Sequence, residues 1–209
     1  MRALILVDIQ NDFLPGGRLA VPDGDAVVPV ANALMDCVDV VVGTLDWHPA
    51  DHGSFATQHA GRSPGEQITL HGLDQTLWPD HCVAWTGGAA PAPALDSARV
   101  ERFFTKGTTP EVDSYSGFWD NGRRKETELR AWLQARGVTE VLVVGLALDY
   151  CVKFTALDAR DAGFHTTVVV DATRAVNLDP ADGDRALAEL EAAGVAVRRS
   201  DALRTAAAV

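Results

Sequence analysis

The stretch that most constrains the fold is Val141–Val144, four consecutive apolar residues of which three are β-branched. A continuous apolar run, as opposed to an alternating one, is typical of a strand that is buried on both faces, as in parallel sheets covered by helices. We expect this strand to end at Gly145 and a helix to begin near Asp149, a residue type that favours the N-cap position. The pattern therefore predicts a strand–turn–helix unit of an α/β fold.

This unit places Cys151 at the carboxyl end of a buried strand and in the first turn of a helix. The unpaired N–H groups and the dipole at a helix start favour an anion, so we expect a thiol pKa below its usual value of about 8.5. Such a thiolate would be a nucleophile. The alternative is a small buried apolar side chain, which is the common state of a lone cysteine.

Strand-like and helix-like segments alternate along the rest of the chain. This order predicts an open parallel sheet with helices packed against it. The 209 residues, 47% of them hydrophobic, suit one domain, residues 1–209. We expect strands at 3–7, 38–43, 99–105, 141–144, 165–170 and 195–197, and helices at 25–37, 125–136, 149–162 and 182–193.

The net charge of −11 argues against a surface for nucleic acid or an anionic membrane. No apolar run approaches the roughly 20 residues that span a bilayer, and we expect neither a signal peptide nor a membrane segment. The three cysteines are an odd number without paired spacing, which indicates reduced thiols in a cytoplasmic protein.

Charged residues follow several of the predicted strands. Asp8 comes directly after the first strand, Asp46 follows the second and Lys106 follows the third. Taken singly, such an aspartate is often a turn residue and such a lysine a solvated charge. Because the carboxyl ends of parallel strands share one edge of the sheet, we expect these groups to lie near Cys151.

A second set of residues has the chemistry of a metal site. Asp46 and His48 are two positions apart, so their side chains point to the same side of an extended segment. His81 comes from a long region of little periodicity, residues 51–93, and long loops in compact domains tend to be functional. Carboxylate and imidazole ligands suit a divalent transition metal. We expect the other loop histidines, His52, His59 and His71, to be solvated.

Apolar and aromatic loop residues are candidates for a binding pocket. Phe13 and Leu19 lie in a glycine-rich loop that lacks the spacing of a phosphate cradle. Trp78 shares a turn with His81, and Tyr115 lies in an aromatic loop suited to stacking on a flat ring.

The combination of motifs resembles the nicotinamidases (pyrazinamidases) of the isochorismatase-like cysteine hydrolases. Their order and spacing are more specific than any single motif. The matching stretches are Val7-Asp-Ile-Gln-Asn-Asp-Phe13, Pro15-Gly-Gly-Arg-Leu-Ala-Val21, Asp46-Trp-His-Pro49, His52-Gly-Ser-Phe55, Trp78-Pro-Asp-His-Cys82, Lys106-Gly107, Asp113-Ser-Tyr-Ser-Gly-Phe118 and Gly145-Leu-Ala-Leu-Asp-Tyr-Cys-Val152.

The resemblance implies a three-layer α-β-α fold with a six-stranded parallel sheet. It also implies hydrolysis of nicotinamide to nicotinate and ammonia in NAD salvage, with pyrazinamide as a second substrate. One divalent transition metal is implied, zinc first, with iron or manganese also compatible. We expect no nucleic-acid or membrane partner, and the sequence leaves a homodimer open.

Carried over by position, the family's catalytic triad falls on Asp8, Lys106 and Cys151. The resemblance implies a non-proline cis peptide at Leu146–Ala147, which would present the N–H groups of Ala147 and Cys151 as an oxyanion hole. The implied metal ligands are Asp46, His48 and His81, with His52 as a further candidate, and the substrate contacts are Phe13, Leu19, Trp78, Tyr115 and Ala147.

Three other functions stay open at this point. An amidohydrolase acting on another amide or carbamoyl group would need the triad but not the metal ligands. A vinyl-ether hydrolase of the isochorismatase type would leave Cys151 and those ligands unexplained. A non-catalytic binding module could keep the same fold, and ammonia release would distinguish it from an enzyme.

Overall fold

The structure, a computed structural model, describes residues 1–206, so the last three residues of the expected domain 1–209 lie outside the described part. One six-stranded sheet has the order β5-β2-β1-β6-β7-β8, and all neighbouring strands are parallel. The predicted six-stranded parallel sheet is therefore confirmed. Its strands are β1 (Arg2–Val7), β2 (Val40–Asp46), β5 (Arg102–Lys106), β6 (Glu140–Leu146), β7 (His165–Arg174) and β8 (Ala196–Arg198).

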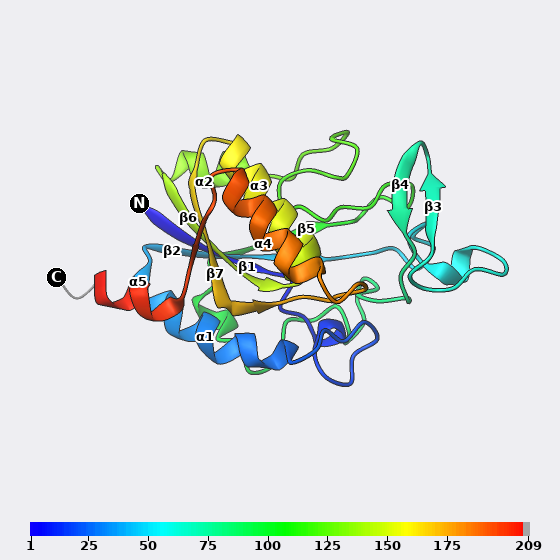
Figure 1. Ribbon diagram of the computed structural model, residues 1–209, viewed down its shortest axis with the longest axis horizontal. Helices are drawn as coiled ribbons and strands as arrows, with labels where there is room; N and C mark the ends of the chain where they lie inside the picture. Colours follow the sequence, from blue (N-terminus) through cyan, green and yellow to red (C-terminus); the bar gives the residue numbers. More distant parts are fainter. Residues whose placement is uncertain (207–209) are drawn as a thin grey trace.

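Helices cover both faces of this sheet (Figure 1). Alternate residues of β1 point to opposite faces, so Ile5 and Val7 join one core and Leu4 and Leu6 the other. Burial on both faces explains why the strand sequences are continuously apolar. The first core lies under α2 (Leu129–Ala135), α3 (Lys153–Asp161) and α4 (Asp182–Ala192), and the second under α1 (Val27–Leu34) and α5 (Ser200–Ala206).

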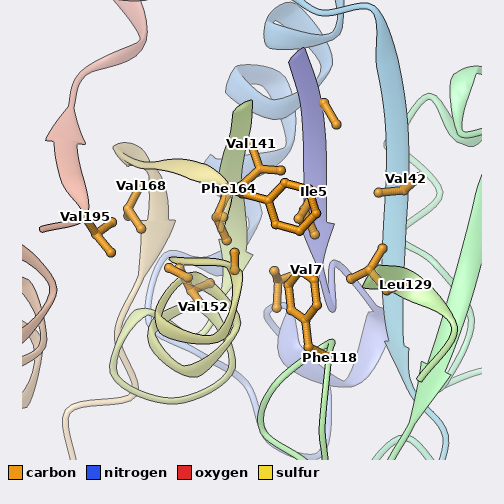
Figure 2. Packing of buried hydrophobic residues seen from close by; sticks show 14 of the residues in the cluster. Ile5, Val7, Val42, Phe118, Leu129, Val141, Val152, Phe164, Val168 and Val195 are labelled. Carbon is orange, nitrogen blue, oxygen red and sulfur yellow. The ribbon is translucent and has the colours of Figure 1, made fainter. Parts of the chain in front are cut away.

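The first core shows how closely the central strands are covered. In Figure 2, Ile5 of β1 lies beside Val141 of β6, and Phe118 and Leu129 lie close to Val7 at the other end of β1. All five side chains are fully buried. Close packing of this kind leaves little freedom for the strand ends to move, which favours a rigid site at the sheet edge.

The strand register brings the predicted charged residues to one edge. Val7 pairs with Thr44 of β2 and with Gly145 of β6, and Asp46 pairs directly with Lys106 of β5. Asp8 follows Val7 immediately. The groups that the sequence places at strand ends therefore start from neighbouring backbone positions.

The predicted strand end at Gly145 was wrong, because β6 continues to Leu146. Gly145 has a φ of +114°, and the pairing of β6 with β7 shifts between Val143 and Gly145. A Cβ at this position would lie 2.0 Å from the carbonyl oxygen of Val7. Glycine therefore bends the strand and does not end it.

The predicted N-cap role of Asp149 was also wrong. One π-helical turn, Leu148–Val152, precedes α3, so the α-helix itself begins at Lys153. The buried Asp149 carboxylate accepts hydrogen bonds from the backbone N–H groups of Val176 (2.9 Å) and Asn177 (2.8 Å). Cys151 thus lies in the π-helical turn, and Asp149 ties that turn to the loop after β7.

A β-hairpin in the long loop region was missed. β3 (Gln67–Leu70) and β4 (Leu73–Thr76) are antiparallel and lie at the far end of the molecule from the N-terminus (Figure 1). Their two-residue turn, His71-Gly72, has positive φ at both positions. Such a turn is the signal for a short hairpin, although His in place of Asn or Asp obscured it.

The other predicted elements are present with shifted ends. The helix expected at 25–37 is α1 flanked by two 3-10 turns, and the helix expected at 125–136 begins only at Leu129. Within residues 1–206, no helix is both long enough and apolar enough to cross a membrane.

Candidate active site

Lys106 lies at the centre of the three predicted triad residues. Its ammonium contacts Asp8 Oδ2 (2.8 Å) and Cys151 Sγ (3.3 Å), and it donates a hydrogen bond to the carbonyl oxygen of Ser114 (2.8 Å). The other carboxylate oxygen of Asp8 accepts a hydrogen bond from the Thr44 hydroxyl (2.7 Å). Lys106 is 2% exposed and Asp8 is fully buried, so neither the solvated-lysine nor the surface-turn interpretation holds.

The charges in this cluster influence the protonation states of Lys106 and Asp8. Burial opposes the charged form of Lys106, yet the carboxylates of Asp46 and Asp8 outweigh it and raise the Lys106 pKa. Burial also raises the pKa of Asp8, against the opposing effect of Lys106. The protonated form of Lys106 is therefore favoured despite its burial.

The predicted lowering of the Cys151 pKa was wrong. Burial raises the pKa of this thiol well above its usual value; Lys106 opposes the rise, and the carboxylates of Asp8 and Asp46 add to it. The physical reason is that desolvation and two nearby negative charges disfavour a thiolate. These surroundings favour the thiol over the thiolate, so a nucleophilic role for Cys151 would need a nearby base.

The predicted metal ligands form a second buried cluster. One donor atom each from Asp46, His48 and His81 lies within 4.8 Å of the others. The Nε2 atoms of His48 and His81 lie 3.6 and 3.7 Å from Asp46 Oδ2, while their Nδ1 atoms lie 2.9 and 2.8 Å from the carbonyl oxygens of Gly107 and Pro79.

The carbonyl contacts fix the orientation of both imidazoles. A carbonyl oxygen can only accept, so Nδ1 of each ring carries a hydrogen, and Nε2 is the atom that faces Asp46 and can bind a metal when it is unprotonated. Orientation of a ligand imidazole through its other nitrogen is the usual arrangement of protein metal sites. Asp46, His48 and His81 therefore fit a divalent transition metal in donor type, burial and orientation.

His52 lies next to this cluster and is buried, so its predicted solvation was wrong. Its ring centroid is 4.3 Å from that of His48, and its Nδ1 pairs with the Ser54 hydroxyl at 2.7 Å. The buried Nε2 has no hydrogen-bond partner among residues 1–206. Burial, reinforced by His48, lowers the His52 pKa to about 4, so the ring is neutral at pH 7. Donor atoms of His48, His52 and Asp113 also lie within 4.8 Å of one another.

The remaining loop histidines lie outside both clusters. His59 is half-buried and its Nε2 bonds to the carbonyl oxygen of Gly53 (2.7 Å), so it is held by the loop and only partly solvated. His71 is exposed, as predicted. Cys82, next to His81, packs in the core below α1 and is absent from the metal-binding groups of the described residues.

A small cavity joins the two clusters. The structure brings all five residues predicted to contact substrate into its lining. The Phe13 ring meets His81 edge-on at 5.5 Å, and the Trp78 ring meets that of Tyr150 edge-on at 4.9 Å. The lining consists of Phe13, Leu19, Asp46, Trp78, His81, Asp113, Tyr115, Ala147, Tyr150, Cys151 and Val176.

The turn before Cys151 has the conformation that the resemblance implies. The Leu146–Ala147 peptide bond is cis. The carbonyl oxygen of Ala147 accepts hydrogen bonds from the N–H groups of Tyr150 (3.1 Å) and Val152 (3.0 Å), which closes the turn around Cys151. The oxyanion-binding role of the Ala147 and Cys151 N–H groups stays a prediction.

The chain is similar to known proteins over most of its length. The model of the isochorismatase domain matches residues 2–202. The chain belongs to the isochorismatase family. This family member is 51% identical over 197 residues to the nicotinamidase of Escherichia coli (strain K12), and the match covers 92% of each chain.

Solved structures of the isochorismatase family have the same fold. The nicotinamidase/pyrazinamidase of Acinetobacter baumanii superimposes with a TM-score of 0.94 at 41% identity, over 97% of each chain. The pyrazinamidase of Pyrococcus horikoshii in complex with zinc superimposes with a TM-score of 0.76 at 36% identity, over 95% of this chain and 98% of that one.

Three cavity residues of this isochorismatase-family site were not among the predicted contacts. Tyr150 could have been found from its place beside Cys151, and Asp113 from its place at the start of the aromatic loop. Val176 had no sequence signal. It reaches the cavity because Asp149 binds the backbone of its loop, a contact between segments 27 residues apart.

Proposed function

We propose that the protein is a nicotinamidase that hydrolyses nicotinamide to nicotinate and ammonia, in NAD salvage, and accepts pyrazinamide as well. The observation that carries this proposal is a small cavity lined both by Cys151 and by Asp46 and His81, two residues of the Asp46, His48 and His81 cluster. A thiol with an adjacent base suits acyl transfer from an amide. A neighbouring metal site suits a substrate with a ring nitrogen.

In the proposed mechanism, Asp8 is the general base and later the general acid. Donor atoms of Asp8 and Cys151 lie within 4.8 Å, and Lys106 contacts both side chains. Asp8 takes the thiol proton as sulfur attacks the carboxamide carbon, which forms the C–S bond. Asp8 then protonates the leaving nitrogen as the C–N bond breaks, because an amide ion is too basic to leave unprotonated. Ammonia and a thioester result.

The second half of the cycle removes the acyl group. Asp8, now ionised, takes a proton from water as the water oxygen attacks the thioester carbon, and it passes that proton to sulfur as the C–S bond breaks, which returns the Cys151 thiol. The proposed oxyanion donors are the backbone N–H groups of Ala147 and Cys151, which would stabilise the negative oxygen in both steps. Lys106 keeps Asp8 and Cys151 in register throughout.

The proposed role of the metal site is to orient the substrate. Asp46, His48 and His81 would hold the ion, which when bound supplies a coordination position for the ring nitrogen. Phe13 and Trp78 would then pack on the faces of the ring and exclude water. We propose zinc because one carboxylate and two imidazoles suit it and because the relative from Pyrococcus horikoshii is a zinc complex.

Release of ammonia from nicotinamide by the purified protein tests this function. Release should be lost after chelation and restored by zinc, and iron(II) and manganese(II) should be tried in parallel. Release that is unaffected by complete metal removal would contradict the proposed role of the metal site in orienting the substrate. No release with any metal, from folded protein, would contradict the proposal.

We further propose a single catalytic domain that works in the cytoplasm. All three cysteines, Cys37, Cys82 and Cys151, are free thiols, which suits a reducing compartment. A homodimer is also proposed, and the sedimentation velocity of the purified protein would test it.

A further inference from the structure

The segment after β1 contacts the backbone of a proposed metal ligand. Gln10 is fully buried, and its amide Nε2 donates to the carbonyl oxygens of Asp46 and Ala89, both at 2.8 Å. Its Oε1 accepts from the Asp46 N–H at 2.9 Å. One side chain therefore satisfies both backbone groups of Asp46, much as a neighbouring strand would.

Two positions further on, Asp12 contacts the loop of a second ligand. Its Oδ2 accepts from the N–H of Cys82 at 2.7 Å, and its Oδ1 accepts from the N–H of Arg18 at 3.3 Å. Cys82 follows His81 directly and has a φ of +45°, which is uncommon for a residue with a side chain. The Asp12 carboxylate thus stabilises the backbone turn that presents His81.

The surroundings of Asp12 fit its carboxylate closely. A Cβ built on Gly88 would lie 2.1 Å from Asp12 Oδ2, so the Gly88 loop closes directly over the side chain. The backbone carbonyl oxygen of Asp12 accepts from the N–H of Leu19 (2.9 Å), a residue of the cavity wall. Asp12 therefore links the metal-ligand loop to the wall of the cavity.

We propose that Gln10 and Asp12 are positioning residues that hold Asp46 and His81 in the geometry for metal binding. The proposal rests on the metal site of the proposed function. Its physical basis is that the ligands come from separate chain segments, and fixing those segments before binding removes an ordering cost from metal affinity. Loss of such supporting hydrogen bonds typically lowers metal affinity about 10- to 100-fold.

The test measures zinc affinity without substrate, by competition with a chromophoric chelator. Gln10→Met removes all three hydrogen bonds of Gln10 at similar size, and Asp12→Ala removes both acceptors of Asp12. Each should raise the zinc Kd by about 10- to 100-fold. Asp12→Asn keeps one acceptor oxygen for Cys82 and should fall between Asp12→Ala and the wild type.

Asp149→Asn is the matched control. Asp149 is likewise a buried carboxylate that accepts two backbone N–H groups, those of Val176 and Asn177, but it braces the loop after β7. Its substitution should leave the zinc Kd within about twofold of the wild type, because the supporting contacts of the metal ligands stay intact. Circular dichroism and thermal melting identify any variant that fails to fold. If Gln10→Met fails to fold, the zinc Kd values of Asp12→Ala and Asp12→Asn still test the proposal.

A merely structural role gives a different result. Zinc binding is measured at about 20 °C below the melting temperature of each variant. If Gln10→Met and Asp12→Ala melt at a lower temperature than the wild type but have the same zinc Kd, the proposal is wrong. The ammonia assay adds a second criterion: activity should fall at limiting zinc and kcat should recover at saturating zinc. A kcat that stays low at saturating zinc would also overturn the proposal.

Failure of the proposed function gives a separate pattern. If the wild type binds zinc but releases no ammonia from nicotinamide, the nicotinamidase proposal fails while the zinc Kd values still test Gln10 and Asp12. If the wild type binds no zinc, the positioning proposal fails with the metal site.

Discussion

The two halves of the candidate site are built in different ways. Asp8 and Lys106 belong to the sheet: one follows β1 directly and the other is the last residue of β5. His48 and His81 belong to loops and are oriented by backbone carbonyls. The strand register therefore places the groups proposed for bond cleavage, whereas hydrogen bonds between loops place those proposed for substrate orientation.

Asp46 belongs to both halves. It is the last residue of β2, it pairs in register with Lys106, and its carboxylate also contacts the Lys106 ammonium. Burial opposes ionisation of Asp46, but Lys106 and then His48 outweigh it and lower the Asp46 pKa well below its usual value. The two halves therefore share one charge network.

The largest expected effect separates chemistry from metal binding. Cys151→Ala should lower ammonia release by at least about 10,000-fold, because no other nucleophile can form the thioester, while the zinc Kd stays unchanged. Cys37→Ser, a thiol outside the site, is the control and should retain activity. Turnover within tenfold of the wild type in Cys151→Ala would refute the mechanism.

The loop half is tested by His48→Ala. Removing a proposed ligand should raise the zinc Kd by roughly 1,000-fold, more than loss of a supporting hydrogen bond does, and should raise the KM for nicotinamide. Zinc titration and steady-state kinetics measure the two effects. Unchanged zinc affinity in a folded His48→Ala protein would show that the metal binds elsewhere.

The sheet half is tested through Gly145, whose Cβ would collide with the backbone of β1. Gly145→Ala should lower the free energy of unfolding by about 3 kcal/mol, since it combines a clash with a strained φ. Gly163→Ala is the matched control: its φ is +92°, and a Cβ there would meet nothing within 4 Å. The control should cost about 1 kcal/mol. Equal losses in urea denaturation would contradict this explanation.

The smallest expected effect concerns His52 in the metal-free protein. Its pKa falls from about 6.5 to about 4 on folding, so the unfolded chain binds more protons between these values. Stability should therefore decrease by about 2 kcal/mol as the pH falls from above 6.5 to about 5. His52→Asn should remove this part of the slope in urea denaturation. An identical slope in the variant would argue against a buried neutral ring.

The fold was predictable where the signal is local. The apolar run Val141–Val144 identified a buried strand, because a strand covered on both faces needs apolar residues at every position. The hairpin β3–β4 was missed because its strands alternate weakly in burial and its turn lacks the usual residues. The π-helical turn around Cys151 was also missed, since its sequence carries an ordinary helical pattern.

The sequence by itself determined the order of the six sheet strands and of helices α1 to α4, and it placed Asp8, Asp46, Lys106 and Cys151 at strand ends, since these depend on residue type and spacing along the chain. Only the tertiary structure decided the direct pairing of Asp46 with Lys106 and the raised pKa of Cys151. It also decided the contacts of Gln10 and Asp12. These features depend on strand register, burial and hydrogen bonds between segments 36 to 70 residues apart, which no local pattern encodes.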